Sequence, residues 1–453
     1  MTESNICMNK KFDQTVSDIP SGIFTCFLDG EEVGILEFSP SHIKIRLSNK
    51  VEKKIENMEI ICFNLKEKAY RTIKPEKVFW SEPTEKEFWW EYCGMIEDEK
   101  YREVVSFVIK QYYDYIVIKS ESFDNVFSKE LIGYPAEKDD EFHENLATWK
   151  LAQQREIEQK NFIEKMLDLN VEIAVSLENP ECYDAFLNDN LAELIDKRIL
   201  EKANRFYIGN QFCHNLFPKW EQLFQMLEKA RAERKQVTLA FTYLREELLD
   251  ATEQLLEEIY QWSKMSNFPL EIIINDWGML QGKEDYFSIG YGTLLNRRRK
   301  DPRYSYKNTS EKEWKCLEEN SLNVEEYKNF IGELGITRLE YECSGYLMKL
   351  PGEKLAEQHR IQGITMHLPL YQTNTSQFCT LHALCTKQNR GHQEFIRECP
   401  KYCKDYACMY PKHLNMIGRY NSLFAMDKNL LEHPEILERY KNTGMDRIVW
   451  NLI

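Results

Sequence analysis

The sequence predicts an α/β protein in which a (β/α) barrel is preceded by a small, mostly β domain. After residue 171, apolar and β-branched strand runs alternate with helix-length segments, the pattern of a parallel sheet covered on both faces. The stretch from 171 to 453 is long enough for a barrel, which typically needs about 250 residues. Cysteines gather near its end, which indicates that the barrel carries a specialised site.

Residues 1–135 are predicted to form the β domain, as a meander or small barrel. Runs rich in Ile, Val, Phe and Tyr are separated by turn signals such as Asp29-Gly30. The runs are GIFTCFLDG, EVGILEF, HIKIRLS, MEIICFNL and YDYIVIK. The segment LEFSPSHIKIRLS resembles the central strand pair of PilZ domains, which implies a PilZ-like scaffold. The glycine and arginine pair that would hold cyclic di-GMP are missing, so an unrelated β interaction module is the alternative.

Residues 136–170 are predicted to be a helical linker, because their apolar residues recur at mixed steps of three and four. The barrel is then expected to span 171–453. Its strands are expected at 171–177, 205–210, 237–243, 270–276, 336–343, 363–371 and 446–453. The functional residues of such a barrel lie just after each strand, on its C-terminal face.

Composition limits the classes of partner. The net charge of −15 repels polyphosphate, so bulk nucleic-acid binding is not expected, although a local basic patch could still take RNA. The sequence has no signal-peptide core and no run near the ~20 apolar residues of a membrane span. These features predict a cytoplasmic protein that does not bind membranes. Thiols stay reduced in the cytoplasm, so clustered cysteines indicate metal before disulfide.

Five of the 13 cysteines lie between Cys379 and Cys408. Cys213 follows the second predicted strand and is expected to face the same side of the barrel as this stretch. Thiolates that converge on one barrel mouth are typical of an iron–sulfur cluster. Zinc is the alternative, but zinc sites usually contain Cys-x-x-Cys pairs, and this sequence has none.

Two other groups of residues are candidates for chemistry. Asn275 and Asp276 follow the fourth predicted strand, where Asp276 could orient substrate, act as a base or simply cap the next turn. Arg297, Arg298 and Arg303 belong to the strongest basic run, RRRKDPR, which could bind an anionic substrate or be a solvated loop. No His-Glu-x-x-His, Gly-x-Ser-x-Gly or P-loop motif occurs, which disfavours a conventional protease or ATPase.

Four segments make the barrel part of the chain resemble a known family. RFYIGNQFCHNLF, NDWGML, GTLLNRRRKDPRY, and LPLY followed by the cysteine stretch, resemble the collagenase-like peptidase family (peptidase U32) and within it the UbiV-type branch. The resemblance implies a [4Fe-4S] cluster held by four cysteines, with two flanking cysteines as alternates. The four are Cys213, Cys385, Cys399 and Cys403, and the alternates are Cys379 and Cys408.

The resemblance also implies a function. Relatives that keep the cysteines are implied to act in oxygen-independent hydroxylation of quinone precursors or RNA bases, with prephenate as a suspected oxygen source. We therefore expect an anaerobic iron–sulfur hydroxylase, or an accessory to one, that takes a small anionic substrate or cosubstrate and has RNA or a protein as a further partner. The alternatives are a non-catalytic scaffold stabilised by zinc or a cluster, and a peptidase, for which the sequence offers no nucleophile.

Overall fold

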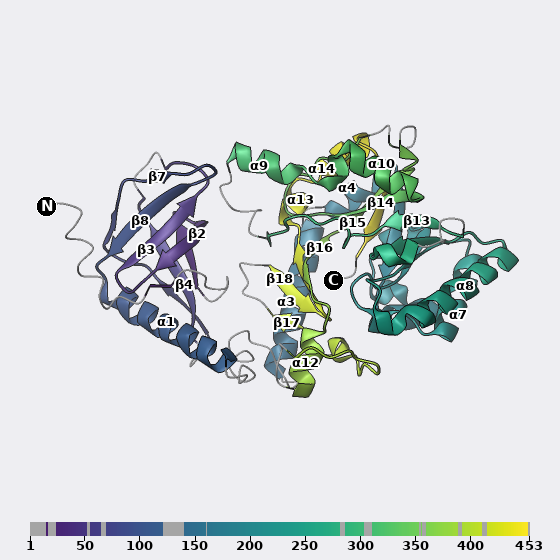
Figure 1. Ribbon diagram of the computed structural model, residues 1–453, viewed down its shortest axis with the longest axis horizontal. Helices are drawn as coiled ribbons and strands as arrows, with labels where there is room; N and C mark the ends of the chain where they lie inside the picture. The colour runs from purple at the N-terminus through teal and green to yellow at the C-terminus, as the bar shows by residue number, and fades with distance from the viewer. Residues whose placement is uncertain are drawn as a thin grey trace.

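The computed structural model describes residues 15–16, 24–51, 55–64, 69–120, 140–159, 161–280, 286–302, 310–352, 355, 359–387, 392–409 and 415–451. An antiparallel sheet unit lies beside a larger barrel unit (Figure 1). Among the described helices, none is both long and apolar enough to cross a membrane.

The N-terminal unit is an open antiparallel half-barrel and not the closed small barrel that the sequence suggested. Its strand order is β5-β4-β1-β2-β3-β8-β6, with β7 paired to β8. The strands are β1 (Phe24–Leu28), β2 (Glu31–Phe38), β3 (His42–Leu47), β4 (Met58–Asn64), β5 (Ala69–Ile73), β6 (Val78–Trp80), β7 (Thr84–Glu85) and β8 (Trp90–Ile96).

Helix α1 (Glu99–Ser120) completes the core of this sheet. Its buried residues Tyr101, Val105 and Val108 recur at steps of three and four and pack with the strand side chains. The Tyr101 hydroxyl donates a hydrogen bond to the carbonyl of Ser39, 2.9 Å away, in the turn between β2 and β3. The prediction of a strand at YDYIVIK, residues 113–119, is wrong: β-branched residues there continue the helix.

The C-terminal unit confirms the predicted parallel barrel. Eight strands close in the order β10-β11-β12-β13-β14-β15-β20-β9. They are β9 (Glu172–Leu177), β10 (Arg205–Gly209), β11 (Gln236–Ala240), β12 (Glu271–Ile274), β13 (Ser288–Tyr291), β14 (Ile336–Glu342), β15 (Gly363–Leu368) and β20 (Met445–Trp450).

Strand β13 is the one that the sequence analysis missed. It has only four residues, and Gly290 among them gives no strand signal. The glycine is needed because a Cβ at this position would overlap the side chain of Ile273 on neighbouring β12. Close approach of two strands, and not a loop, therefore explains this glycine.

A charged layer crosses the barrel interior near the start of the strands. Arg447 on β20 donates hydrogen bonds to Glu172 (2.6 Å) and to the hydroxyl of Tyr207 (2.9 Å), and it also pairs with Glu271. Burial would raise the pKa of Glu271, but Arg447, Arg338 and Arg205 together hold it below its usual value. This end of a barrel normally serves stability.

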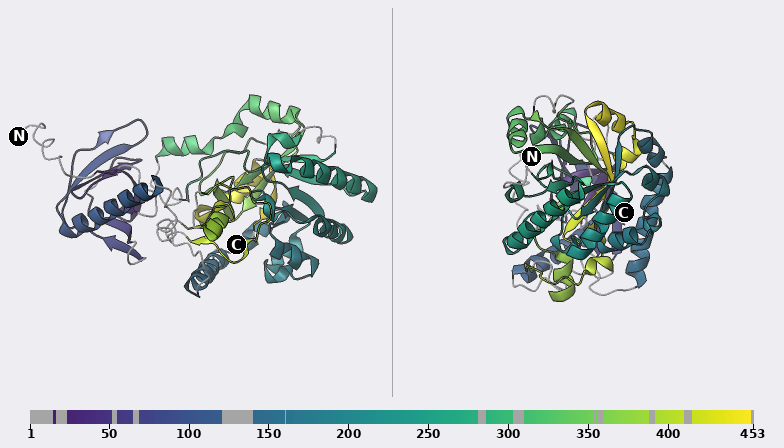
Figure 2. Two further views of the ribbon diagram at one scale, coloured as in Figure 1. Left: turned by 60° about the horizontal axis from the view of Figure 1, so that its bottom comes forward. Right: turned by 90° about the vertical axis from the view of Figure 1, so that its right-hand side faces the viewer.

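Helices surround the barrel, as Figure 2 shows from two further directions. The segment expected as a linker contributes α3 and α4, whose Ile157, Phe162 and Met166 are buried in the barrel core. The helices are α3 (Asp140–Gln159), α4 (Phe162–Leu167), α5 (Pro180–Leu187), α6 (Lys197–Lys202), α7 (Trp220–Ala232), α8 (Leu249–Ser266), α9 (Glu311–Glu318), α10 (Glu325–Glu333), α13 (Lys428–Glu432) and α14 (Ile436–Asn442).

A small lobe, residues 370–426, is inserted between β15 and β20, and we call it the cysteine lobe. Its antiparallel sheet has the order β16-β19-β18-β17 and carries helix α12 and the short helix η9. The elements are β16 (Leu370–Thr375), α12 (Thr380–Lys387), η9 (Tyr402–Lys404), β17 (Cys408–Met409), β18 (Met416–Arg419) and β19 (Ser422–Met426). Because it directly follows β15, the lobe sits at the C-terminal mouth of the barrel.

Candidate metal centre and adjoining cavity

Cys213 enters the site from the barrel, in the loop that follows β10. Its side chain is buried, with 8% of its surface exposed. The loop turns inward because the side-chain oxygen of Asn210 accepts hydrogen bonds from the backbone N–H groups of both Phe212 and Cys213, each at 2.8 Å. This side-chain turn fixes the direction of the Cys213 thiol.

Three further cysteines enter from the cysteine lobe. Cys379 precedes α12, Cys399 lies in an irregular segment, and Cys403 lies on η9. Together with Cys213 they line one small pocket, which we call the cysteine pocket. Its other lining residues are Asn215, Leu216, Leu381, His382, Tyr402 and Tyr420. Four thiols from distant parts of the chain therefore share one enclosed space.

Backbone N–H groups point at two of these sulfurs. The N–H of His382 donates to Cys379 Sγ at 3.4 Å, and the N–H of Lys401 donates to Cys399 Sγ at 3.4 Å. At Cys379 this follows from position, since the first N–H groups of a helix such as α12 have no partner inside the helix. Such bonds favour the thiolate, which is the form that binds metal.

The electrostatics oppose bare thiolates at three of these cysteines. Burial raises the pKa of Cys403 to about 11 and that of Cys379 to about 12. Burial raises the pKa of Cys213 further, and negative charge on the neighbouring cysteines would raise it more. A positively charged centre would let these three thiols ionise together, because it would offset both their burial and their mutual repulsion.

The two remaining candidates stand beside the pocket without lining it. Cys385, on α12, and Cys408, on β17, belong to an apolar cluster with Leu381 that also touches Cys379 and Cys403. Cys379, expected as an alternate, therefore lines the pocket with Cys213, whereas Cys385, expected as a ligand, does not.

Four sulfur ligands suit an iron–sulfur cluster or a zinc ion. Within the described ranges, no three His, Cys, Asp or Glu side chains lie close enough together to form a ready site for a metal ion. In a four-iron cluster each cysteine binds a different iron, so its ligands stand farther apart than those of one ion.

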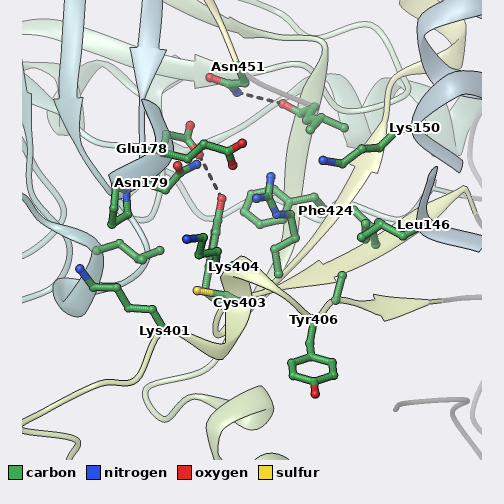
Figure 3. A pocket seen from close by; sticks show the side chains of 18 of the residues that line it. Leu146, Lys150, Glu178, Asn179, Lys401, Cys403, Lys404, Tyr406, Phe424 and Asn451 are labelled. Atoms are coloured by element: carbon green, nitrogen blue, oxygen red, sulfur yellow. Dashed lines mark hydrogen bonds between the residues drawn. The ribbon is translucent and has the colours of Figure 1, made fainter. Parts of the chain in front are cut away.

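A cavity of about 390 Å³ adjoins the cysteine pocket. Cys403, Tyr420 and Leu216 line both spaces. Its walls come from α3, from the loop after β9, from the cysteine lobe and from the end of β20. Figure 3 shows how the side chains of Lys150, Glu178, Phe424 and Cys403 surround it. This is the mouth of the barrel, where barrel enzymes bind substrate.

Glu178 is the carboxyl group at the inner wall of this cavity. Its Oε1 accepts a hydrogen bond from the hydroxyl of Ser176 at 3.0 Å, and its Oε2 accepts one from the hydroxyl of Tyr420 at 3.2 Å. Burial raises its pKa, while the Ser176 hydroxyl and the Arg419 charge oppose that shift. A carboxyl with a raised pKa in a cavity can give or take a proton near neutral pH.

Arg419 and Lys150 line the same cavity. Burial lowers the pKa of Lys150, and the positive charge of Arg419 lowers it further. Arg419 stacks over the Tyr420 ring, with its guanidinium carbon 5.4 Å from the ring centroid. Neither residue gave a signal in the sequence, because isolated Lys and Arg residues are common in helices and hairpins.

Asn275 and Asp276, the two residues predicted to be catalytic, both form hydrogen bonds with backbone groups. Asn275 is 4% exposed, and its side chain bonds the carbonyl of Phe241 at 2.7 Å and the N–H of Leu294 at 2.9 Å. Asp276 accepts hydrogen bonds from the N–H groups of Gly278 (2.8 Å) and Leu244 (3.3 Å). Asp276 therefore caps the turn after β12, and neither residue lines the cavity or the cysteine pocket.

Two of the three arginines of the predicted anion site belong to the described residues. Arg297 is exposed, and Arg298 donates to the carbonyl of Glu342 at 2.8 Å. Arg303 lies outside the described residues. Lys300, which the sequence analysis did not single out, is buried and pairs with Glu342. Its burial lowers its pKa, and the Glu342 charge counters that shift. This loop ties β13 to β14.

Comparisons with known proteins add little to this geometry. No family model and no curated protein matches the chain. Among solved structures it matches an uncharacterized Legionella protein at 12% identity, covering 22% of this chain and 95% of that chain, with a TM-score of 0.17. A TM-score this low carries no argument about fold or function.

Proposed function

We propose that this protein binds a [4Fe-4S] cluster through Cys213, Cys379, Cys399 and Cys403 and uses it in an oxidoreductase reaction. The observation that carries the proposal is the meeting of four cysteine side chains in one enclosed pocket. The resemblance to the collagenase-like peptidase family supports the same cofactor. The proposed ligand set contains Cys379 and not Cys385, because Cys379 lines the cysteine pocket and Cys385 packs beside it.

The adjoining cavity supports an enzyme over a scaffold. A bound cluster would supply one-electron transfer at the wall formed by Cys403 and Tyr420. Glu178 stands on the same wall, and its carboxyl group can exchange a proton with a bound molecule. Arg419 and Lys150 supply positive charge for an anionic group. Arg419 and Lys150, the Glu178 carboxyl group and the proposed cluster thus surround one cavity that is large enough for a small substrate.

The reaction class that we favour is oxygen-independent hydroxylation, as the family resemblance implies. Written with balanced atoms, a C–H compound receives a hydroxyl group from an organic donor: R–H plus R′–OH gives R–OH plus R′–H. The donor is reduced as the acceptor is oxidised, so molecular oxygen is not required. A peptidase is less well supported, because Cys403, the thiol that lines the cavity, is assigned to the cluster.

Anaerobic purification tests the cofactor. Iron, acid-labile sulfide and zinc are assayed and the visible spectrum is recorded for the wild type and for Cys399→Ser. The matched control is Cys316→Ser, since Cys316 is exposed on α9 and outside the pocket. We expect about four irons with equal sulfide in the wild type and the control, and a bleached Cys399 variant. One zinc per chain without sulfide would overturn the redox proposal and favour the scaffold alternative.

A further inference from the structure

The cavity beside the cysteine pocket has the walls of a site for a flat apolar group. Leu146, Trp149 and Phe424 line it and belong to, or pack against, one hydrophobic cluster. Phe424 is held edge-on by Phe212, with ring centroids 5.1 Å apart, so its face is fixed in place. A volume of about 390 Å³ admits a small molecule with one aromatic ring and a side chain.

Two cations of this cavity make no close side-chain ion pair. Within the part of the chain that the structure describes, the side chains of Lys150 and Arg419 have no hydrogen-bond or salt-bridge partner, and both residues are half-buried. Glu181 acts on Lys150 and Glu178 acts on Arg419 only at longer range, and Arg419 stacks on Tyr420. An anion at hydrogen-bond distance would therefore stabilise both half-buried cations. A carboxylate matches the guanidinium fork of Arg419 and would also neutralise Lys150.

The opening of the cavity favours a small acid over a nucleic acid. Glu181, Asp184 and Lys404 line the cavity and are exposed, so the exposed charge that an RNA backbone would meet there is net negative. The net charge of −15 acts in the same direction. A compact monocarboxylate avoids this repulsion, because its charge is neutralised inside by Arg419 and Lys150.

We propose that the cavity binds a small aromatic carboxylic acid, with the carboxylate on Arg419 and Lys150 and the ring against Phe424 and Trp149. As a substrate assignment this rests on the proposed function, since it places the ring beside Cys403 and Glu178. As a binding site it stands on the cavity alone. It also moves the anion site from the Arg297–Arg303 loop to the cysteine lobe and α3.

The test measures binding of 3-phenylpropanoate and of its neutral isostere 3-phenylpropanamide to the full chain by calorimetry. We expect the acid to bind at least about 10-fold more tightly than the amide, because charge-assisted bonds to Arg419 are lost with the amide. Arg419→Gln should weaken binding of the acid by about 10- to 100-fold and leave binding of the amide unchanged. Arg297→Gln is the matched control and should bind both compounds like the wild type.

Several results would overturn the inference: no binding of either compound, equal affinity for acid and amide, or a loss in Arg297→Gln in place of Arg419→Gln. Competition by a short RNA oligonucleotide that binds more tightly than the acid would favour a nucleic-acid site instead. Arg419 is partly buried, so its substitution can destabilise the fold. If Arg419→Gln unfolds, the comparison of acid and amide binding to the wild type still tests the inference. Repeating the titration on Cys399→Ser separates the two proposals. If Cys399→Ser lacks the cluster but still binds the acid, the cavity assignment holds independently of the cluster. If the wild type contains the cluster but does not prefer the acid to the amide, only the cavity assignment is overturned.

Discussion

The hydroxyl of Tyr420 donates a hydrogen bond to Oε2 of Glu178 over 3.2 Å, and the Tyr420 side chain lines both the cysteine pocket and the cavity. One residue therefore separates the proposed redox centre from the proposed substrate and contacts the carboxyl group that can carry a proton. A substitution of Tyr420 or Glu178 should therefore affect both the cysteine pocket and the cavity.

Removal of the Tyr420 hydroxyl should raise the pKa of Glu178. Burial already raises this pKa, and the Tyr420 hydrogen bond opposes the shift because it stabilises the carboxylate. Ionised Glu178 repels a bound acid, so binding of 3-phenylpropanoate should weaken as pH rises through the Glu178 pKa. Calorimetric titrations between pH 5 and 8 should show this decline at higher pH in Tyr420→Phe. Glu178→Gln should abolish it, and an unchanged decline in that variant would assign the titration to another group.

Cys379, which precedes α12, and Cys385, which lies on α12, should differ in their effect on iron content. Cys379→Ser should lose most of the iron and sulfide, because Cys379 lines the cysteine pocket with Cys213. Cys385→Ser should keep both, because Cys385 packs in the apolar cluster beside the pocket. Iron and sulfide assays on anaerobically purified variants measure the difference. The opposite result would restore the ligand set that the family resemblance implies.

The charged layer inside the barrel should be sensitive to loss of one partner. Arg447→Met leaves Glu271 and Glu172 with less positive charge in a buried place, which should cost about 3–5 kcal/mol. Arg198→Met removes an exposed pair with Asp196 and should cost at most about 1 kcal/mol. Denaturant midpoints of the barrel unfolding transition compare the two variants. Similar midpoints would mean that the layer contributes little.

The same layer predicts an acid limb of stability. The pKa of Glu271 is held below its unfolded value, so its contribution is present above about pH 4.5 and is lost as pH falls through the folded pKa. Wild-type midpoints should therefore drop below about pH 4. In Glu271→Gln this drop should be smaller, and a drop of the same size would assign the acid limb to other carboxyl groups.

Gly209 should be among the least replaceable residues of the barrel. Its φ is +114°, and a Cβ there would overlap the carbonyl oxygen of Ala240. It ends β10 just before the loop that carries Cys213, so Gly209→Ala should destabilise the barrel by at least about 2 kcal/mol and disturb the cysteine pocket. Gly278→Ala, at an exposed turn without positive φ, is the control. Thermal unfolding with an iron assay tests both effects.

The barrel could be predicted from sequence because its strands are buried on both faces and therefore read as apolar runs. Strand β13 was missed because Gly290, which close strand packing requires, removes the β-propensity signal. The run at 113–119 was misassigned because β-branched composition suggested a strand, while its place in α1 follows from the helical spacing of Tyr101, Val105 and Val108. Closure of the N-terminal sheet depends on long-range pairing that composition does not encode.

The site was predictable only in part. Cys213 could be placed at the barrel mouth because it follows a recognisable strand, and the clustered cysteines were visible in one stretch. Which of them line the pocket with Cys213 depends on where α12 begins, since Cys379 lies just before its first residue and Cys385 lies farther along the helix. Lys150 and Arg419 are isolated cations on elements far apart in sequence, so only folding shows that they share a cavity.

The placement of the cysteine lobe between β15 and β20 affects how the protein can be made. At 5–20 residues per second, Cys213 leaves the ribosome roughly ten seconds or more before Cys403. The barrel mouth is not complete until β20, near the end of the described chain, pairs with β9. Cys213 is therefore synthesised well before the other three cysteines of the pocket. A cluster held by Cys213 and Cys403 could be completed only after the cysteine lobe has been made.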